Sequence, residues 1–349
     1  LESDIRKKMT VRKGKIRRMR WWSFGASVAG VLLILGVGIM LWMKPEENGV
    51  WEGEKTVEPG IGQVVLTLGD GESMPLKRDT NRLIFGGTML QVRNERGTLV
   101  YSRIKSKEAS EKIVYNTLTV PVRERFQLVL ADGTKVFLNS GSEMRYPERF
   151  GKARREVFLK GEAWFEVAKD SAREFWVHAG AMDVKVLGTS FNVKAYERLE
   201  TVATTLVEGR VEGACAGKSF QIVPGEQFVY DKNNRVMDVR MVDTESYVSW
   251  KDGYYKFRQT TLEEIMETLS VWYGLNVFYV NESAKQVEFT GKVKRYEDAR
   301  MLLDKFEQTG DVVFDIKGNN VFITIKQKKP FAREWNSFLV KARGMVWQS

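Results

Sequence analysis

The chain has 349 residues, 43% of them hydrophobic and 29% charged, which is the composition of a folded protein and excludes a wholly disordered one. Its one cysteine, Cys215, excludes an internal disulfide and a cysteine-rich zinc module, and its one histidine, His178, leaves little material for histidine metal sites. The net charge of +10 would by itself suggest an acidic partner such as nucleic acid or a membrane surface.

Most of this charge is confined to the N-terminus. Residues 1–20 contain nine basic and two acidic residues, giving +7, and residues 21–43 contain no charge. The remaining residues therefore carry only +3, ten minus seven, which disfavours a nucleic-acid-binding domain in the bulk of the chain.

The uncharged run of residues 21–43 predicts a transmembrane helix whose ends are Trp21 and Met43. Its ten Val, Ile, Leu and Phe residues favour insertion into a lipid bilayer by about 3–6 kcal/mol. A cleaved signal peptide is the alternative, but it has a shorter apolar region and a small-residue cleavage site. The basic residues before the run place the N-terminus in the cytoplasm, so we expect a single-pass inner-membrane protein whose bulk, residues 44–349, is periplasmic.

The exported part begins with strand and turn signals. Residues 44–60 have the Pro, Gly and charge content of a linker. Asp-Gly turns between alternating apolar residues predict hairpins at 63–76 and 126–138. Short strands with turn residues between them continue to about residue 240, and this spacing predicts a mainly β domain, a sandwich or a barrel.

The pattern changes at Trp250. Two amphipathic helices are expected, the first capped by Thr260 or Thr261 and ended by Gly274, the second at about 296–309. With the strands between and after them, the order is β-α-β-β-α-β-β, a small α+β domain whose helices lie on one face of one sheet.

No residue set with catalytic spacing stands out, and we expect no enzyme activity, catalytic residue, cofactor or metal. His178 lies inside an apparent strand, without a G-x-S-x-G elbow in the chain, and is expected to be a structural or surface residue. Asp132, Glu162 and Glu166 could form paired carboxylates, but exposed acids at turns and on the outer face of strands are the expected alternative. Cys215 has no partner pattern of a nucleophile.

Several segments carry motifs of one family. They lie at residues 128–142, 146–147, 156–167, 186–193, 206–209 and 224–227, and after them at 250–325. Together they resemble the FecR family of transmembrane anti-sigma regulators. The 250–325 segment resembles the α+β domain that closes many of these proteins, which is similar to the signalling and secretin N-terminal modules of outer-membrane receptors. One departure is Arg123, within a segment where the family often has a glycine-containing turn.

The resemblance implies a mechanism. A cytoplasmic segment holds an extracytoplasmic-function (ECF) sigma factor, and the periplasmic domains sense the signalling domain of an outer-membrane TonB-dependent receptor. From the charge distribution we expect no nucleic-acid partner; a nucleic-acid-binding arm is the alternative for residues 1–20, whose position before the anchor already explains their charge. Family members place a longer helical segment before the anchor than the 20 residues found here, so the sigma-binding part is expected either upstream of Leu1 or not at all.

The sequence therefore predicts six parts: a basic cytoplasmic segment (1–20), a transmembrane helix (21–43), a linker with a small β region (44–114), a FecR-like β domain (115–249), an α+β domain (250–326) and a tail (327–349). We also expect the α+β domain to offer a sheet edge to a receptor module by strand addition. The strand expected to form this edge consists of Val321, Phe322, Ile323, Thr324 and Ile325. A membrane-anchored structural or glycan-binding module is the alternative function, and an anchored hydrolase is a third.

Overall fold

In this computed structural model, the structure describes residues 62–77, 82–86, 90–95, 98–103, 113–295 and 298–326. All of them belong to one of the two units into which the chain divides, Lys55–Ser349. The expected transmembrane helix at 21–43 lies outside the described residues. Among the residues that are described, no helix has both the length and the apolar character needed to cross a bilayer.

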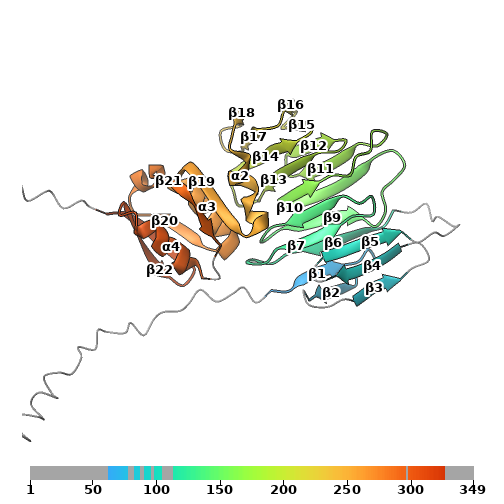
Figure 1. Cartoon of the computed structure of the whole chain (residues 1–349), viewed down its shortest axis with the longest axis horizontal. Helices are drawn as coiled ribbons and strands as arrows, with labels where there is room; N and C mark the ends of the chain where they lie inside the picture. The colour runs from blue at the N-terminus through green and yellow to red at the C-terminus, as the bar shows by residue number, and fades with distance from the viewer. Residues whose placement is uncertain are drawn as a thin grey trace, which may run out of the picture. The chain divides into compact units, whose positions relative to one another are not determined.

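Strands β1 to β18, here called the β domain, form two sheets that share a core (Figure 1). The order of the first sheet is β2 (Ser73–Leu76), β1 (Val64–Thr67), β6 (Tyr115–Thr119), β9 (Glu143–Pro147), β10 (Arg155–Glu166), β11 (Phe175–Ala179), β12 (Met182–Val186), β15 (Val211–Cys215) and β16 (Lys218–Ile222). Its neighbouring strands are antiparallel except for β10 and β11.

The order of the second sheet is β3 (Arg82–Gly86), β4 (Leu90–Glu95), β5 (Thr98–Arg103), β7 (Phe126–Val129), β8 (Lys135–Leu138), the second half of β10, β13 (Ser190–Ala195), β14 (Thr201–Glu208), β17 (Glu226–Asp231) and β18 (Val236–Met241). Strand β10 joins both sheets. It changes sheet at Gly161, whose φ is +101° and whose Cβ position would lie 2.7 Å from the Cα of Ser142, so only glycine fits there.

The alternating pattern places one side of each strand in the core. In strand β8, Val136 and Leu138 are buried, whereas Lys135 is exposed and Phe137 half-buried, and strand β12 alternates buried and half-buried residues. Both Asp-Gly hairpins are confirmed: β1 pairs with β2 and β7 with β8, with Leu66 opposite Met74 and Leu128 opposite Val136. The expected mainly β architecture is therefore present.

The remaining elements begin with a short helix, α2 (Thr244–Val248), and a 3₁₀ turn, η1 (Ser249–Asp252), neither of which the sequence pattern predicted. The C-terminal domain then comprises β19 (Tyr254–Thr261), α3 (Leu262–Tyr273), β20 (Asn276–Tyr279), η2 (Glu282–Gln286), β21 (Glu288–Lys294), α4 (Ala299–Glu307), β22 (Val312–Lys317) and β23 (Asn320–Ile325). Helix α3 begins where expected, because the Thr261 hydroxyl accepts a hydrogen bond from the N–H of Glu264, and it ends at Gly274, whose φ is +68°.

The described strands of this domain form two small sheets instead of the one predicted sheet. Strand β19 pairs with β21, while β20, β23 and β22 form a separate sheet in that order. The predicted edge strand, Val321–Ile325, is therefore wrong as an edge: β23 is the central strand, paired in parallel with β20 and antiparallel with β22. Its backbone groups are used on both sides, so strand addition there is excluded.

Candidate functional site at the junction of the two domains

The apolar core of the C-terminal domain includes a residue of the β domain. Trp164 of β10 belongs to this core together with Trp250 of η1, and both side chains are buried. Phe137 of β8 and Val207 of β14 pack against the same cluster. The two domains therefore meet over a buried apolar patch.

A buried polar chain lies beside these tryptophans. The indole N–H of Trp250 donates to Asn192 Oδ1 at 3.3 Å, and Asn192 Nδ2 donates to Glu162 Oε1 at 2.9 Å. The second carboxylate oxygen of Glu162 accepts from Asn139 Nδ2 at 2.8 Å. Glu162 is only 7% exposed, and this burial raises the pKa of its carboxyl above the ordinary value. The expectation that Glu162 is an exposed acid was wrong, because the C-terminal elements cover the outer side of its strand.

Residues 139–142, within one of the family-like motifs, form the other half of the junction. The hydroxyl of Ser140 lies 3.1 Å from the carbonyl oxygen of Val271 and 3.2 Å from that of Trp272, so it donates to the carbonyl end of helix α3. The phenolic O–H of Tyr196 donates to the Ser140 carbonyl at 2.7 Å. These contacts tie the end of helix α3 to the β domain.

Arg123 is next to this contact. Its backbone N–H donates to Ser140 Oγ at 2.9 Å, and its φ is +69°, a conformation that favours glycine. The chain therefore departs from the family pattern at a residue with left-handed backbone conformation. Arg123 adopts this conformation in the turn although it is not a glycine. The guanidinium lies 5.9 Å from the centre of the Tyr273 ring, which belongs to helix α3.

A cleft of about 310 Å³ opens between the domains beside Glu162. Its rim carries opposite charges from the two sides: Lys194 of β13 lies 3.7 Å from Glu267 of α3, and Arg240 of β18 lies 3.6 Å from Glu264. Burial also raises the pKa of Glu267. These pairs stabilise the contact modestly but restrict its geometry.

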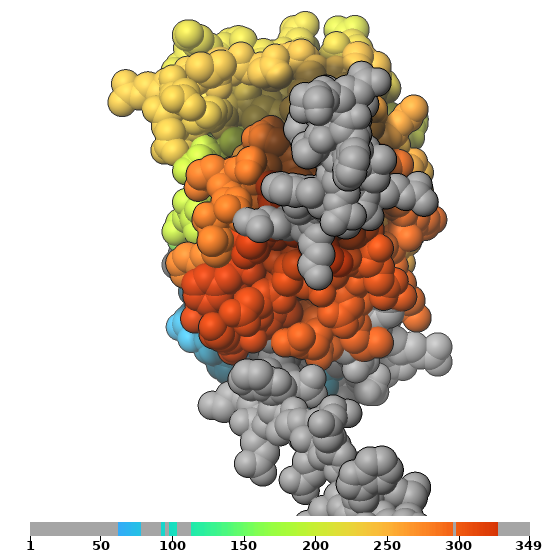
Figure 2. Space-filling view, turned by 90° about the vertical axis from the view of Figure 1, so that its left-hand side faces the viewer, coloured from blue at the N-terminus to red at the C-terminus, as the bar shows by residue number. Residues whose placement is uncertain are grey.

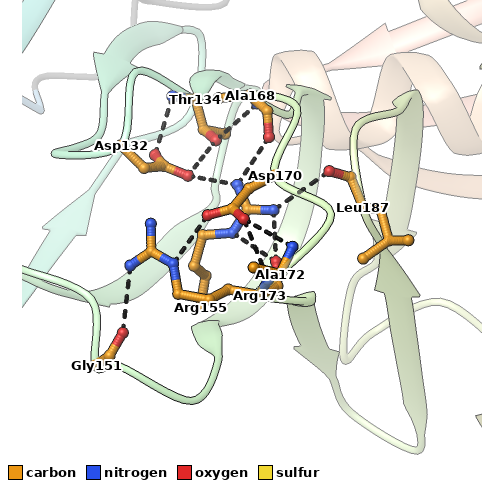
Figure 3. Close-up of polar contacts among 9 residues, drawn as sticks. All are labelled: Asp132, Thr134, Gly151, Arg155, Ala168, Asp170, Ala172, Arg173 and Leu187. Carbon is orange, nitrogen blue, oxygen red and sulfur yellow. Dashed lines mark hydrogen bonds and ion pairs between the residues drawn. The ribbon is translucent and has the colours of Figure 1, made fainter.

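Asp132 of the second Asp-Gly turn is also buried, contrary to the expectation of an exposed acid, and it forms an ion pair inside the β domain (Figure 3). Arg155 Nη1 lies 2.9 Å from Asp132 Oδ2, and the Arg155 side chain is fully buried. The same guanidinium donates to the carbonyl oxygens of Ala168, Arg173 and Leu187. This cluster joins the β7–β8 turn to the first sheet and has the geometry of a structural element.

The other residues considered as candidate catalytic groups lie outside the junction. The His178 ring contacts two carboxylates, Asp183 at 2.7 Å and Glu156 at 3.6 Å, and stacks on Phe158. Cys215 is buried, and burial raises the pKa of its thiol to about 11, so the reactive thiolate is scarce at neutral pH. Glu166 is exposed as expected, with a side-chain exposure of 39%.

The three-stranded sheet of the C-terminal domain leaves apolar side chains in solvent. Phe278 and Val280, in and directly after β20, are 47% and 63% exposed, and Val313 of β22 is 40% exposed. The Phe278 ring stacks on Phe322 of the central strand at 5.1 Å. The sequence analysis selected β23 and not these neighbours, although the uninterrupted apolar run at residues 277–280 shows that both faces of β20 carry apolar side chains.

Two family models match the chain. The "FecR protein" model matches residues 116–212, and the "FecR, C-terminal" model matches residues 254–323. Both matched segments are thus similar to FecR-family domains. The junction is the contact between these two FecR-like domains, and it uses residues of both matched segments, such as Glu162 and Val271.

Solved structures agree with this assignment. Two crystal structures of a candidate anti-sigma factor from Parabacteroides distasonis ATCC 8503 are each similar with a TM-score of 0.55 and 27% sequence identity. They match 60% of this chain, and the match covers 98% and 99% of the solved chains. No curated protein matches the chain.

Proposed function

We propose that this chain is a single-pass inner-membrane anti-sigma regulator that responds to an outer-membrane, TonB-dependent receptor. The match to the FecR-family model and the similarity to a candidate anti-sigma factor support regulation of a sigma factor. The apolar run from Trp21 to Met43, with the basic residues before it, supports the anchor and a cytoplasmic N-terminus. The proposed parts keep the predicted boundaries after residues 20, 43, 249 and 326. The predicted boundary after residue 114 falls inside the β domain, because β1 pairs with β6 and β5 pairs with β7.

In this proposal the C-terminal domain binds the signalling domain of the receptor. The junction then transmits the resulting conformational change to the β domain. The observation that carries it is the construction of the junction: beside the apolar contact around Trp164, it contains a polar chain from Trp250 to Glu162 and cross-domain ion pairs. Polar contacts of this kind are sensitive to small displacements, because hydrogen bonds weaken steeply with distance and angle.

The receptor module would contact the sheet of the C-terminal domain. Both sides of its central strand β23 are already paired. A partner can therefore contact the outer edges of β20 and β22 and the exposed side chains of Phe278 and Val280. We expect Phe278→Glu to reduce capture of receptor signalling domains by the full chain. Met301→Glu is the matched control, since Met301 is 54% exposed on helix α4.

The coupling is tested with a reporter gene under the control of the cognate sigma factor. Lys194→Glu places two acids together across the junction and should abolish the response to the receptor signal, while the double variant Lys194→Glu, Glu267→Lys should restore it. A normal response in the single variant would refute the role of the junction. Fusions of periplasmic and cytoplasmic reporters to the C-terminus test the topology, and activity of a cytoplasmic reporter would refute it.

A further inference from the structure

Strand β18 ends the second sheet with an uncovered edge. Among the described residues it pairs only with β17, and five of its six residues are exposed. Three of these are apolar: Val236, Val239 and Met241 are 56%, 44% and 71% exposed. The yellow part of the chain, which contains β17 and β18, projects at the top of Figure 2. Proteins usually protect such edges with prolines, charged side chains or bulges. Strand β18 has no proline and no bulge, and its two charged residues, Asp238 and Arg240, have opposite signs.

The hydrogen-bond pattern shows which backbone groups are free. The N–H of Val242 donates to the carbonyl of Gly225, so Val242 faces β17. Because backbone direction alternates along an antiparallel strand, Arg240 and Asp238 also face β17, and Met237, Val239 and Met241 direct their N–H and C=O groups outward. At the outward edge, three residues thus have backbone N–H and C=O groups that form no strand pairing with the described residues.

The side chains of this edge are complementary to themselves. Residues 237–241 read Met-Asp-Val-Arg-Met, so an acid and a base flank a central valine symmetrically. A second copy placed antiparallel about Val239 sets Val239 opposite Val239 and Met237 opposite Met241. Asp238 then lies opposite Arg240 of the other copy, at the non-hydrogen-bonded positions where side chains are closest.

Other registers are worse. The outward N–H and C=O groups of the two copies must face each other. The second copy can therefore shift only by steps that pair each of residues 237, 239 and 241 with a residue of the same set in the first copy. Centring the pair on residue 238 puts Asp238 opposite its own copy, and centring it on residue 240 puts Arg240 opposite its own copy. Both place like charges in contact, which is unfavourable.

We propose that β18 pairs with β18 of a second copy of this chain, antiparallel and centred on Val239, forming a two-fold symmetric dimer that joins two second sheets. The occupant is a second copy because the edge supplies both members of each charge pair, as an isologous contact requires. The pairing forms about six backbone hydrogen bonds. The Arg240 guanidinium now lies 3.6 Å from Glu264 and donates to Gln227 Oε1 at 3.2 and 3.3 Å and to the Tyr247 hydroxyl at 3.5 Å. Its side chain is 45% exposed, so these contacts are weak ones that a pair with Asp238 of the second copy can replace.

The test is cysteine cross-linking of the full chain, incorporated in lipid nanodiscs with two copies per disc. In the proposed dimer the two residues 239 have Cα atoms about 5.5 Å apart, within the range of a disulfide. Val239→Cys should therefore form a covalent dimer on mild oxidation. Val236→Cys is the matched control, exposed on the same strand, because its two copies would be about 20 Å apart. The native Cys215 is buried and should not react.

Charge variants test the register in the Val239→Cys background. Asp238→Arg and Arg240→Asp should each slow cross-linking roughly three- to thirtyfold, because two attractive pairs become repulsive. A mixture of the two single variants should restore it, since each supplies the charge that the other lacks. Equal cross-linking of Val239→Cys and Val236→Cys would overturn the proposal, and so would an unchanged rate in Asp238→Arg. Circular dichroism checks that each variant is folded. If folded variants in the mixture did not restore the cross-linking rate, the proposal would also be overturned.

Discussion

The buried pair of Arg155 and Asp132 should be one of the most sensitive points of the fold. Arg155→Met removes the only cationic partner of Asp132 that the described residues provide and leaves a carboxylate in the protein interior. Removing one member of a buried ion pair costs about 3–5 kcal/mol. The two hydrogen bonds that Asp132 accepts from the backbone N–H and the hydroxyl of Thr134 remain, which favours the lower half of this range. The carbonyl oxygens of Ala168, Arg173 and Leu187 lose their Arg155 donor, which opposes this effect. We therefore expect a loss of about 3–5 kcal/mol in the free energy of unfolding.

The preceding residue provides the control. Arg154 also forms an ion pair, with Glu156 at 2.5 Å, but its side chain is 57% exposed, so Arg154→Met should cost less than about 1 kcal/mol. Urea unfolding of the full chain, followed by tryptophan fluorescence, measures both variants against the unchanged protein. If Arg155→Met and Arg154→Met lost equal stability, burial would not be the cause of the cost and the reasoning would be refuted.

Three further results are expected. Thr261→Ala should lower the free energy of unfolding by about 1 kcal/mol in urea titrations, because it removes the N-cap of helix α3, and an unchanged midpoint would contradict this. Leu303→Ala should cost about 2–5 kcal/mol while Met301→Ala, on the exposed face of the same helix, should be almost neutral; equal losses would show that α4 is not packed as described. Because burial raises the pKa of Glu162, the folded state holds its proton more tightly than the unfolded state, so stability should fall as pH rises from the ordinary glutamate pKa through the raised one. Glu162→Gln should flatten this slope in unfolding measurements between pH 4 and 8, and an identical slope would show that Glu162 is not its source.

Local signals were sufficient for the elements that depend on neighbouring residues. An Asp-Gly pair specifies its own turn, and the hairpin of β7 and β8 formed where the pair predicted it. Thr261 and Gly274 defined both ends of helix α3, since the cap and the left-handed stop are properties of single residues. None of these predictions required knowledge of the rest of the chain.

Strand order was not available from such signals. Whether β23 lies at the edge or in the centre depends on its parallel pairing with β20, which is more than 40 residues away in the sequence. Periodicity reports how a strand is buried but not which strands flank it. The sheet edge was therefore assigned to the wrong strand, while the two helices of the domain were predicted correctly.

The burial of Arg155 could have been predicted from periodicity. Val157 and Leu159 have the same parity as Arg155 in β10, and all three are buried, whereas Arg154 precedes the strand and is exposed. An arginine at a core position must be paired, because an isolated buried charge is too costly. The sequence was therefore sufficient to predict that Arg155 has a buried acidic partner, but not that this partner is Asp132.

The same strand also contained the signal for the junction. After Gly161 the alternation stops, and residues 161–165 are buried without interruption. A strand in a two-layer sandwich has one face in the core and one in solvent, so a continuous buried stretch requires a further element over its outer face. Ala163 and Phe165 lie in the core of the β domain, while Trp164 enters the core of the C-terminal domain and Glu162 faces the cleft. In the sequence, the consecutive apolar residues Ala163, Trp164 and Phe165 after Gly161 are therefore the signal of the domain contact on which the proposed signalling depends.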